Sequence, residues 1–386
     1  MRRRKALPQE PDNVFLRASY AAPGPEAARH IGSNFGTALK LLGNSSNLSL
    51  ESKTTFATGG ISQVGAYYTP TIQMINHGPD TCVFLADGKG MDIASFLYPS
   101  LAKVGNYTDS AVTNSRLGIV LVAQGNYLFA AYNGQTSQDG QIGVWRIEHG
   151  CALNLVNTYS SLFATFSMAV SPNGQALVIS YETDFCVGSY GIGPGGVLTG
   201  PYLAELNTNN GYAPWGVDIT ADSKYAIFDS QSSFTAVDIF AIDANGSLGN
   251  DYSFGGYGSL GSAKSGGFIR LNPDQKFLFV NDDGEHITTL NFTESPVINL
   301  TFTGCLTTLR VPKDEPSLFS NTMAMALPAG SGGALYVAEV GDFSHIGTFV
   351  VNPSTGCTTE AATSPFQLTD NNAALGSIAA WPPRPF

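Results

Sequence analysis

A series of short apolar runs at residues 118–157 predicts four β-strands. The runs span residues 118–122, 127–131, 142–147 and 153–156. The segments that separate them are a Gln-Gly-Asn turn, a polar loop with two glycines, and a His-Gly-Cys turn. Short β-rich runs bounded by turn residues are typical of an antiparallel meander. One such sheet cannot bury both of its faces, so we expect neighbouring copies along the chain.

The first apolar run of this unit does recur. Its copies are marked by Ile72, Ile119, Met168, Val217, Phe268, Met323 and Ile378, which are 47 to 55 residues apart. The second run recurs too, as in YLFAAYNG and FLFVNDDG, and polar turns such as SPNGQ and NPDQK precede the second runs. A repeat of about 40 to 50 residues with four strands is typical of propeller blades. The sequence therefore predicts an all-β fold, a seven-bladed β-propeller.

The two ends of the chain complete this pattern. We expect residues 1–12 to be disordered and residues 13–386 to form one propeller domain. Residues 13–20, 35–42 and 48–56 match second, third and fourth strands, and no first strand precedes them. The missing copy is the apolar run at residues 377–381. We therefore predict that this C-terminal first strand joins the three N-terminal strands and closes the ring, which removes open sheet edges.

The charge and the apolar content of the chain limit the kinds of partner that we expect. The net charge of −11 argues against nucleic acid, which attracts clustered Lys and Arg, and no run of eighteen apolar residues predicts a membrane span. A signal peptide has an apolar segment after its basic start, and the basic start of this chain is not followed by one. Six Asn-x-Ser/Thr sequons occur where composition alone predicts about four. We expect a monomer outside the cytoplasm, either extracellular or periplasmic, that needs no cofactor.

Five cysteines leave at least one thiol outside any intrachain disulfide. Cys151, Cys305 and Cys357 occupy the same predicted turn, between third and fourth strands, in three blades. Equivalent turns of different blades lie far apart, so we expect these three cysteines not to pair with one another. Cys82 and Cys151 stand near the same rim of adjacent blades, and either a disulfide between them or two buried thiols fits the pattern. No spacing predicts a zinc site.

These features together resemble a known family. Repeats near fifty residues, the SPNG and NPDQKFLFV segments, the Gly-Cys-x-Leu turn and the closing SIAAWPPRPF are similar to those of the seven-bladed lactonase-like propellers. That family includes 6-phosphogluconolactonase-like and carboxymuconate cyclase-like proteins. The resemblance covers the chain from about residue 13. It implies a lactonase or a cycloisomerase, but its motifs carry strands and turns and no catalytic atom.

Propeller chemistry is expected where loops meet at the mouth of the central channel. An enzyme acting on an anionic lactone needs a cationic clamp, an acid or base, and an apolar wall. We predict Glu182 and His30 as catalytic residues. For substrate binding we predict Arg116, Arg29, Trp215, Tyr68, Lys264, Asp282 and Glu285. No metal ligands are predicted.

Plainer interpretations stand beside several of these residues. His286 and His345 begin predicted third strands, where Gln141 and Asp92 hold the equivalent place, so a strand-capping role is favoured. Asp282 and Glu285 match the spacing of no calcium loop, and a solvated turn explains them. Asp184 and Asp229 are as well suited to bonding loop backbone as to chemistry.

Two functions fit the sequence. The first is a metal-independent lactonase or cycloisomerase that acts on a small anionic lactone or its open acid. The second is a non-catalytic extracellular propeller that binds a glycan, a peptide or a protein through the same face. A cluster of Arg with Glu or His at one pocket favours the enzyme, whereas a shallow aromatic face favours the binding protein.

Overall fold

The computed structural model describes strands that lie almost throughout the chain. The residues described are 13–18, 35–44, 47–57, 72–86, 92–112, 118–133, 140–181, 186–206, 214–230, 236–254, 266–282, 286–308, 324–326, 334–339, 345–362, 364, 366–367 and 375–380. This part of the chain contains no α-helix, and its helical turns are η3 (His149–Cys151) and η4 (Pro194–Gly196). None of its helices is long and apolar enough to cross a membrane.

The strands form seven antiparallel sheets, each built mainly from consecutive segments. The sheet that joins the two ends of the chain has the order β29 (Leu375–Ala380), β1 (Asn13–Ala18), β2 (Phe35–Asn44) and β3 (Asn47–Ala57). The next sheets are β4 (Ile72–His77), β5 (Asp80–Ala86), β6 (Asp92–Tyr98) and β7 (Ala102–Thr108); then β8 (Gly118–Gln124), β9 (Tyr127–Asn133), β10 (Gly140–Ile147) and β11 (Leu153–Ser160).

The remaining sheets follow the same order. They are β12 (Thr165–Val170), β13 (Ala176–Tyr181), β14 (Cys186–Ile192) and β15 (Leu198–Glu205); β16 (Pro214–Ile219), β17 (Tyr225–Ser230), β18 (Ala236–Ile242) and β19 (Leu248–Phe254); and β20 (Gly266–Leu271), β21 (Phe277–Asp282), β22 (His286–Thr293) and β23 (Asn299–Thr308). The last has β24 (Ala324–Ala326), β25 (Ala334–Glu339), β26 (His345–Val351) and β27 (Thr358–Glu360), with β28 (Phe366–Gln367) also on β26.

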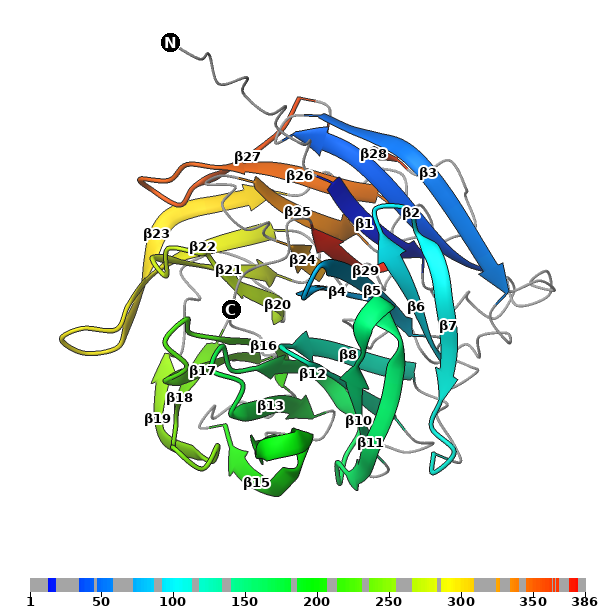
Figure 1. Ribbon diagram of the computed structural model, residues 1–386. Helices are drawn as coiled ribbons and strands as arrows, with labels where there is room; N and C mark the ends of the chain where they lie inside the picture. The colour runs from blue at the N-terminus through cyan, green and yellow to red at the C-terminus, as the bar shows by residue number, and fades with distance from the viewer. Residues whose placement is uncertain are drawn as a thin grey trace, which may run out of the picture.

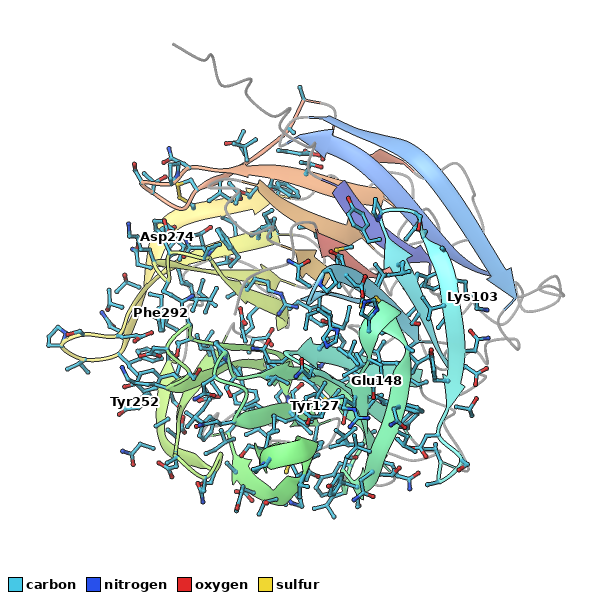
Figure 2. All side chains as sticks on the ribbon, in the orientation of Figure 1. Lys103, Tyr127, Glu148, Tyr252, Asp274 and Phe292 are labelled. Carbon is cyan, nitrogen blue, oxygen red and sulfur yellow. A yellow bond between two sulfur atoms is a disulfide. The ribbon has the colours of Figure 1, made fainter. Side chains whose placement is uncertain are left out.

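Apolar side chains fill the spaces between adjacent sheets. The second strand of a sheet is covered on both faces, and every residue of β13 is buried. The fourth strand forms the outer edge of its sheet, so many of its side chains are exposed to solvent. Lys103 on β7, for example, lies at the margin of the molecule (Figure 2). One cluster joins Val120 and Phe129 to Met168 and Ile179 of the next sheet. The core is therefore a series of similar interfaces, which explains the repeated pattern in the sequence.

The first strands lie nearest the centre of the molecule (Figure 1). Each packs against the first strand of the next sheet, in the order β4, β8, β12, β16, β20, β24 and β29. The C-terminal strand β29 contacts both β24 and β4, the first strands on either side of it. All seven apolar runs predicted as first strands are confirmed as strands at these places.

The two ends of the chain meet in one sheet, as predicted. The strand β29 pairs antiparallel with β1, and the register places Ser377 opposite Arg17 and Ala380 opposite Val14. Trp381, predicted as part of the closing strand, lies outside the described residues, as do residues 1–12. The pairing makes one sheet from segments more than 350 residues apart, so the first and last strands depend on each other.

The turns between first and second strands are tied to one another in series. Gln124 Nε2 donates to the carbonyl oxygen of Pro172 at 2.9 Å. The backbone N–H of Asn173 donates to Ser223 Oγ at 2.9 Å, and that of Ala221 donates to Gln275 Oε1 at 2.8 Å. These bonds link four consecutive sheets at the same end of the molecule, which we call the turn face.

Two disulfides also join neighbouring sheets. Cys82 on β5 bonds to Cys151 at the end of η3, with Cα atoms 5.4 Å apart. Asp80 Oδ2 beside this disulfide accepts the Gly150 N–H at 2.8 Å. Of the two interpretations left open by the sequence, the structure shows the disulfide. Cys186 is in neither disulfide.

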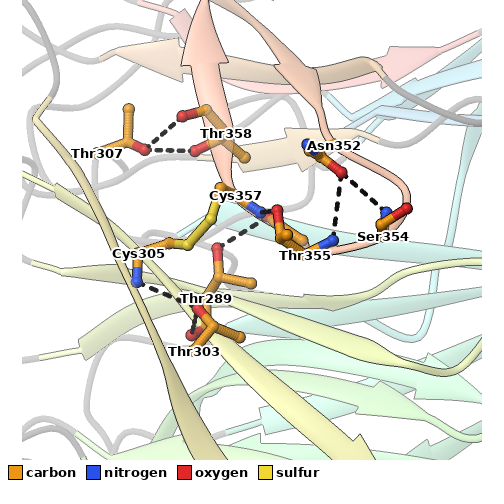
Figure 3. The surroundings of a disulfide bond; sticks show 10 residues. Thr289, Thr303, Cys305, Thr307, Asn352, Ser354, Thr355, Cys357 and Thr358 are labelled. Carbon is orange, nitrogen blue, oxygen red and sulfur yellow. Dashed lines mark hydrogen bonds between the residues drawn. A yellow bond between two sulfur atoms is a disulfide. The ribbon is translucent and has the colours of Figure 1, made fainter.

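The prediction that Cys305 and Cys357 do not pair is wrong. They form the second disulfide, with Cα atoms 5.2 Å apart (Figure 3). The turn between β22 and β23 is residues 294–298, so Cys305 belongs to the ten-residue strand β23 and not to a turn. Cys357 does lie in the turn before β27 of the next sheet. The two positions are therefore not equivalent, and bonds such as Thr307 Oγ1 to the Thr358 carbonyl oxygen at 2.9 Å hold the strands together there.

We expect the double substitution Cys82→Ser with Cys151→Ser to lower the free energy of unfolding by about 2–5 kcal/mol. The disulfide closes a loop with a sequence separation of 69, and its loss frees that loop in the unfolded chain. Denaturant unfolding without reductant measures the effect. Cys186→Ser is the matched control and should leave the midpoint unchanged. Equal midpoints for the double variant and the parent would contradict the prediction.

Candidate functional site

The end of the sheets opposite the turn face gathers the connections in which the sequence predicts function. There the second strands end, the first and third strands begin, and the fourth strands end, because neighbouring strands are antiparallel. We call this end the mouth face. Its strand ends are well defined by pairing, as where Asn133 at the end of β9 lies opposite Gly118 at the start of β8.

Most of the predicted site residues belong to the connections at this face. Both predicted catalytic residues and five of the predicted binding residues lie outside the described residues: His30, Glu182, Arg29, Tyr68, Arg116, Lys264 and Glu285. Asp282 is the last residue of β21, and its backbone lies opposite His286 on β22 and Gly266 on β20. The strand positions on either side of these connections thus lie at one face, and the roles of the side chains stay predictions.

Trp215, predicted as an apolar wall, lies near the start of β16. Its side chain is 8% exposed and stacks on Phe166 of β12, with ring centroids 5.2 Å apart. The Trp215 carbonyl oxygen accepts the hydroxyl of Ser180 on β13 at 3.0 Å. Its ring packs between two sheets directly beneath the mouth face. A substrate contact by Trp215 stays a prediction.

Among the described aspartates and glutamates, Asp229 is the one whose pKa burial raises most. It stands near the end of β17, is fully buried, and accepts the backbone N–H of Gly216 with Oδ1. Its other oxygen, Oδ2, is buried without a hydrogen-bond partner. Burial raises the pKa of Asp229 to about 8, although the Gly216 N–H and its own N–H oppose the rise. The carboxyl group is therefore largely neutral at pH 7 and can donate a hydrogen bond through Oδ2.

The sequence left two roles open for Asp229, and the structure shows backbone bonding. The bonded N–H belongs to Gly216 in a strand, not to a loop. The pairing of β16 with β17 shifts between Pro214 and Val217, which marks a β-bulge at Trp215 and Gly216. Similar shifts occur near the mouth ends of β12 and β20. Asp229 holds the bulged backbone of an innermost strand, and bulges of this kind turn side chains to new directions beside functional sites.

Other polar residues near the ends of second strands make comparable ties. Asn133 on β9 donates from Nδ2 to the Thr165 carbonyl oxygen at 2.8 Å, and its Oδ1 accepts the Thr165 N–H at 2.8 Å. Ser180 on β13 makes the bond to Trp215 described above. Sequence reasoning missed these ties. Their signal was a polar residue at the end of an otherwise apolar run, in YLFAAYN and in ALVIS.

Asp92 and His286 begin third strands, as predicted, and Gln141 is the second residue of its third strand, β10. Asp92 accepts a hydrogen bond from Thr108 on the neighbouring strand, which agrees with the strand-capping role favoured for this position. His345 also begins its strand, β26, opposite Glu339 and Gln367. Among the described residues, no three His, Cys, Asp or Glu side chains group closely enough to hold a metal ion.

Comparison with known sequences finds a partial relative. The chain is 31% identical over 106 residues to 6-phosphogluconolactonase from Yersinia pestis (strain Pestoides F), and equally to that from Yersinia pseudotuberculosis (strain YPIII). The match covers 28% of this chain and 30% of the relative, so it spans less than a third of the curated protein. No family model matches the chain.

Solved structures match along nearly the whole chain. A candidate 6-phosphogluconolactonase from Bacteroides fragilis is 14% identical, with a TM-score of 0.67 and coverage of 97% of this chain and 99% of that one. The periplasmic gluconolactonase of Pseudomonas aeruginosa is 16% identical, with a TM-score of 0.64 and coverage of 95% and 98%. A β-propeller domain from Myceliophteria thermophila is 13% identical, with a TM-score of 0.51 and coverage of 77% and 90%.

These matches show a fold. The all-β structure with its four-stranded antiparallel sheets is that of a β-propeller, and its structural neighbours are 6-phosphogluconolactonase-like propellers. The resemblance expected from the sequence is confirmed at this level.

Proposed function

We propose, on the premise of this likeness to 6-phosphogluconolactonase-like propellers, that the chain is a lactonase built as a closed ring of seven blades. Its substrate is a small anionic, sugar-derived lactone or the corresponding open acid, bound at the mouth face. The observation that carries the proposal is the match to a gluconolactonase over 95% of this chain and 98% of that one. The partial identity to 6-phosphogluconolactonases adds to it.

Ring closure rests on strand contacts. Seven sheets and seven mutually contacting first strands, with β29 touching the first strands on both sides, support seven blades closed by the C-terminal strand. In such a ring the mouth-face connections of different blades surround one central site. Residues far apart in the sequence, such as His30, Arg116 and Glu182, can then serve one substrate.

Lactone hydrolysis assigns roles to the predicted residues. Water attacks the lactone carbonyl carbon, the bond from that carbon to the ring oxygen breaks, and the ring oxygen leaves as a hydroxyl. Glu182 or His30 takes the proton of the attacking water and returns a proton to the leaving oxygen. Arg116 binds the carboxylate or phosphate of the substrate through paired hydrogen bonds, with Arg29 and Lys264 adding positive charge. Tyr68 and Trp215 form the apolar wall, and Asp282 and Glu285 bond sugar hydroxyls.

The described residues support the site from below. Asp229 is fully buried, so we assign it to holding the Gly216 backbone and not to contact with substrate. The strand β16 is thereby fixed at the point where Trp215 packs. We propose no metal ion for the reaction.

The compartment is proposed on two grounds. Both disulfides require oxidising conditions, which the extracellular space, the secretory pathway and the bacterial periplasm provide. The gluconolactonase of Pseudomonas aeruginosa is periplasmic. We therefore place the protein outside the cytoplasm.

We expect Arg116→Ala to lower kcat/KM for an anionic sugar lactone at least about a hundredfold, because loss of a bidentate charged contact costs about 3 kcal/mol. A pH-stat assay with 6-phosphogluconolactone and gluconolactone measures turnover. Arg146→Ala is the matched control, since Arg146 on β10 is half exposed and pairs with Glu148 at 2.5 Å. The melting temperature should not change in either variant.

The same assay separates the alternatives. Turnover of neither lactone by the parent protein, with formation of lactone from an open unsaturated acid, indicates a cycloisomerase. No turnover in either direction, with retention on a glycan or peptide array, indicates the non-catalytic binding protein. Full activity of Arg116→Ala, or its failure to fold, assigns Arg116 to the scaffold.

A further inference from the structure

The six sequons are unevenly distributed over the structure. Five stand in or beside the hairpins that join third and fourth strands: Asn44, Asn47, Asn245, Asn291 and Asn299. The sixth, Asn106, is on β7, the outermost strand of its sheet. All six therefore belong to the outer half of a sheet, away from the innermost strands. The hairpin ends that carry the five face the same way as the turn face.

The connections of the mouth face contain none of the six. Their segments hold eight asparagines, at positions 34, 114, 207, 209, 210, 321, 371 and 372. Many serines and threonines stand there too, yet no asparagine has one two residues later. The six sequons are therefore separated in the sequence from the connections of the proposed site.

Three of the sequon asparagines have exposed side chains. Asn106 is exposed on β7, Asn245 in the turn between β18 and β19, and Asn299 at the start of β23. A glycan on such an asparagine extends into solvent and displaces no core residue. The described surface thus offers three acceptors that the folded protein can carry in modified form.

The sequon at Asn245 closes into a compact turn. Asn245 Oδ1 accepts the Ser247 hydroxyl at 2.8 Å and the Ser247 N–H at 3.1 Å. Gly246 between them has φ +84°, a conformation that a side chain disfavours. These two bonds use only the oxygen of the Asn245 amide and do not involve Nδ2, the atom that N-glycosylation modifies.

The sequon asparagine Asn291 differs from the three exposed ones. Its side chain is only partly exposed, and its Nδ2 donates to Thr301 Oγ1 at 3.3 Å across the β22–β23 pair. Thr301 is also the hydroxyl residue of the Asn299 sequon. The acceptor nitrogen of Asn291 is engaged in the sheet, so it serves as an internal comparison within one protein.

From these observations we propose that Asn106, Asn245 and Asn299 carry N-linked glycans, and that the glycans cover the outer edge of the protein while leaving the mouth face open. The donor is an oligosaccharide linked to a lipid pyrophosphate. The Asn Nδ2 forms a bond to the sugar anomeric carbon, the bond from that carbon to the pyrophosphate oxygen breaks, and the lipid pyrophosphate leaves as the amide loses one proton. The two disulfides independently indicate a compartment in which this chemistry occurs.

The test begins with the full-length protein isolated from its own cells and, in parallel, from a eukaryotic secretory host. Both secreted and retained protein are digested with peptide-N-glycosidase in heavy-oxygen water and mapped by mass spectrometry. We expect the mass signature of deglycosylation at Asn106, Asn245 and Asn299. Asn291 should be modified in a much smaller fraction of molecules. Unmodified peptides at all three positions in the native protein overturn the proposal.

Matched variants separate the sequon from the asparagine. Ser247→Ala keeps Asn245 but removes its sequon and should abolish that glycan alone, whereas Ser247→Thr should retain it. Asn173→Gln, at an exposed turn asparagine without a sequon, should leave the glycan mass unchanged. Lactone turnover should be equal before and after enzymatic removal of the glycans. A large change in KM on deglycosylation would contradict the open mouth face.

Discussion

Deletion of residues 375–386 is expected to abolish cooperative folding. The deletion removes β29, which pairs with β1 and separates the first strands β24 and β4. Without it, β1 becomes the exposed edge of its sheet and two neighbouring first strands lose their packing partner. Unfolding followed by tryptophan fluorescence should show no single transition, and the variant should elute as aggregates in size-exclusion chromatography.

A circular permutant distinguishes the effect of losing the strand β29 from the effect of moving the ends of the chain. Residue 386 is joined to residue 1 by a short Gly-Ser linker, and new ends are opened at the exposed turn between β4 and β5, at Gly78 and Pro79. This chain keeps β29 beside β1 and should unfold cooperatively. A deletion variant with a melting temperature within a few degrees of the parent would show that β29 does not hold the sheets together.

Asp229→Asn is expected to flatten the dependence of stability on pH. Folding raises the pKa of Asp229 from 3.8 to about 8. At pH values between these two, the unfolded chain has lost the proton and the folded protein has kept it. The free energy of unfolding therefore falls as pH rises through this range, by about 1.4 kcal/mol per pH unit. Between pH 5 and pH 8 the loss is about 4 kcal/mol.

Urea unfolding at pH 5, 6, 7 and 8 measures the slope. Asparagine keeps an oxygen for the Gly216 N–H and cannot ionise, so most of the slope should disappear. Asp229→Ala also removes the slope but leaves the buried N–H unpaired and should cost a further 1–3 kcal/mol, roughly, at every pH. Asp238, whose pKa burial raises to about 6, contributes to the slope that remains below pH 6, as do Asp251 and Glu294, whose pKa values burial also raises. An unchanged slope in Asp229→Asn would place the titrating group elsewhere.

The repeat pattern predicted most of the fold. Apolar first and second strands recur because each sheet buries both faces of these strands against its neighbours, and a constraint of that kind appears directly as periodicity. The absence of a first strand before residue 13 and the surplus apolar run at residues 377–381 together predicted the pairing of β29 with β1. The two strands are far apart in the chain, but they hold the places of first and second strand in one repeat.

Features that depend on exact register were less predictable. Cys305 was placed in a turn because Thr-Gly-Cys resembles the segment around Cys357, but β23 is longer than the repeat suggests. Likewise, no periodicity marks the bulge at Trp215 and Gly216 that Asp229 holds. The candidate site combines residues from separate connections, and the sequence predicted the face they share more readily than the role of any one of them.

Because hydrogen bonds join the turns of the turn face, we expect the protein to tolerate inserted residues at the mouth face and not at the turn face. Residues 171–175, 220–224 and 272–276 each carry bonds that fix the spacing of neighbouring sheets, so added residues there would disturb two sheets at once. The mouth-face connections differ widely in length, from residues 283–285 to residues 19–34. We therefore expect that new sequence can enter at the face proposed to bind substrate without altering the sheets beneath, so that recognition loops could be grafted on this single side.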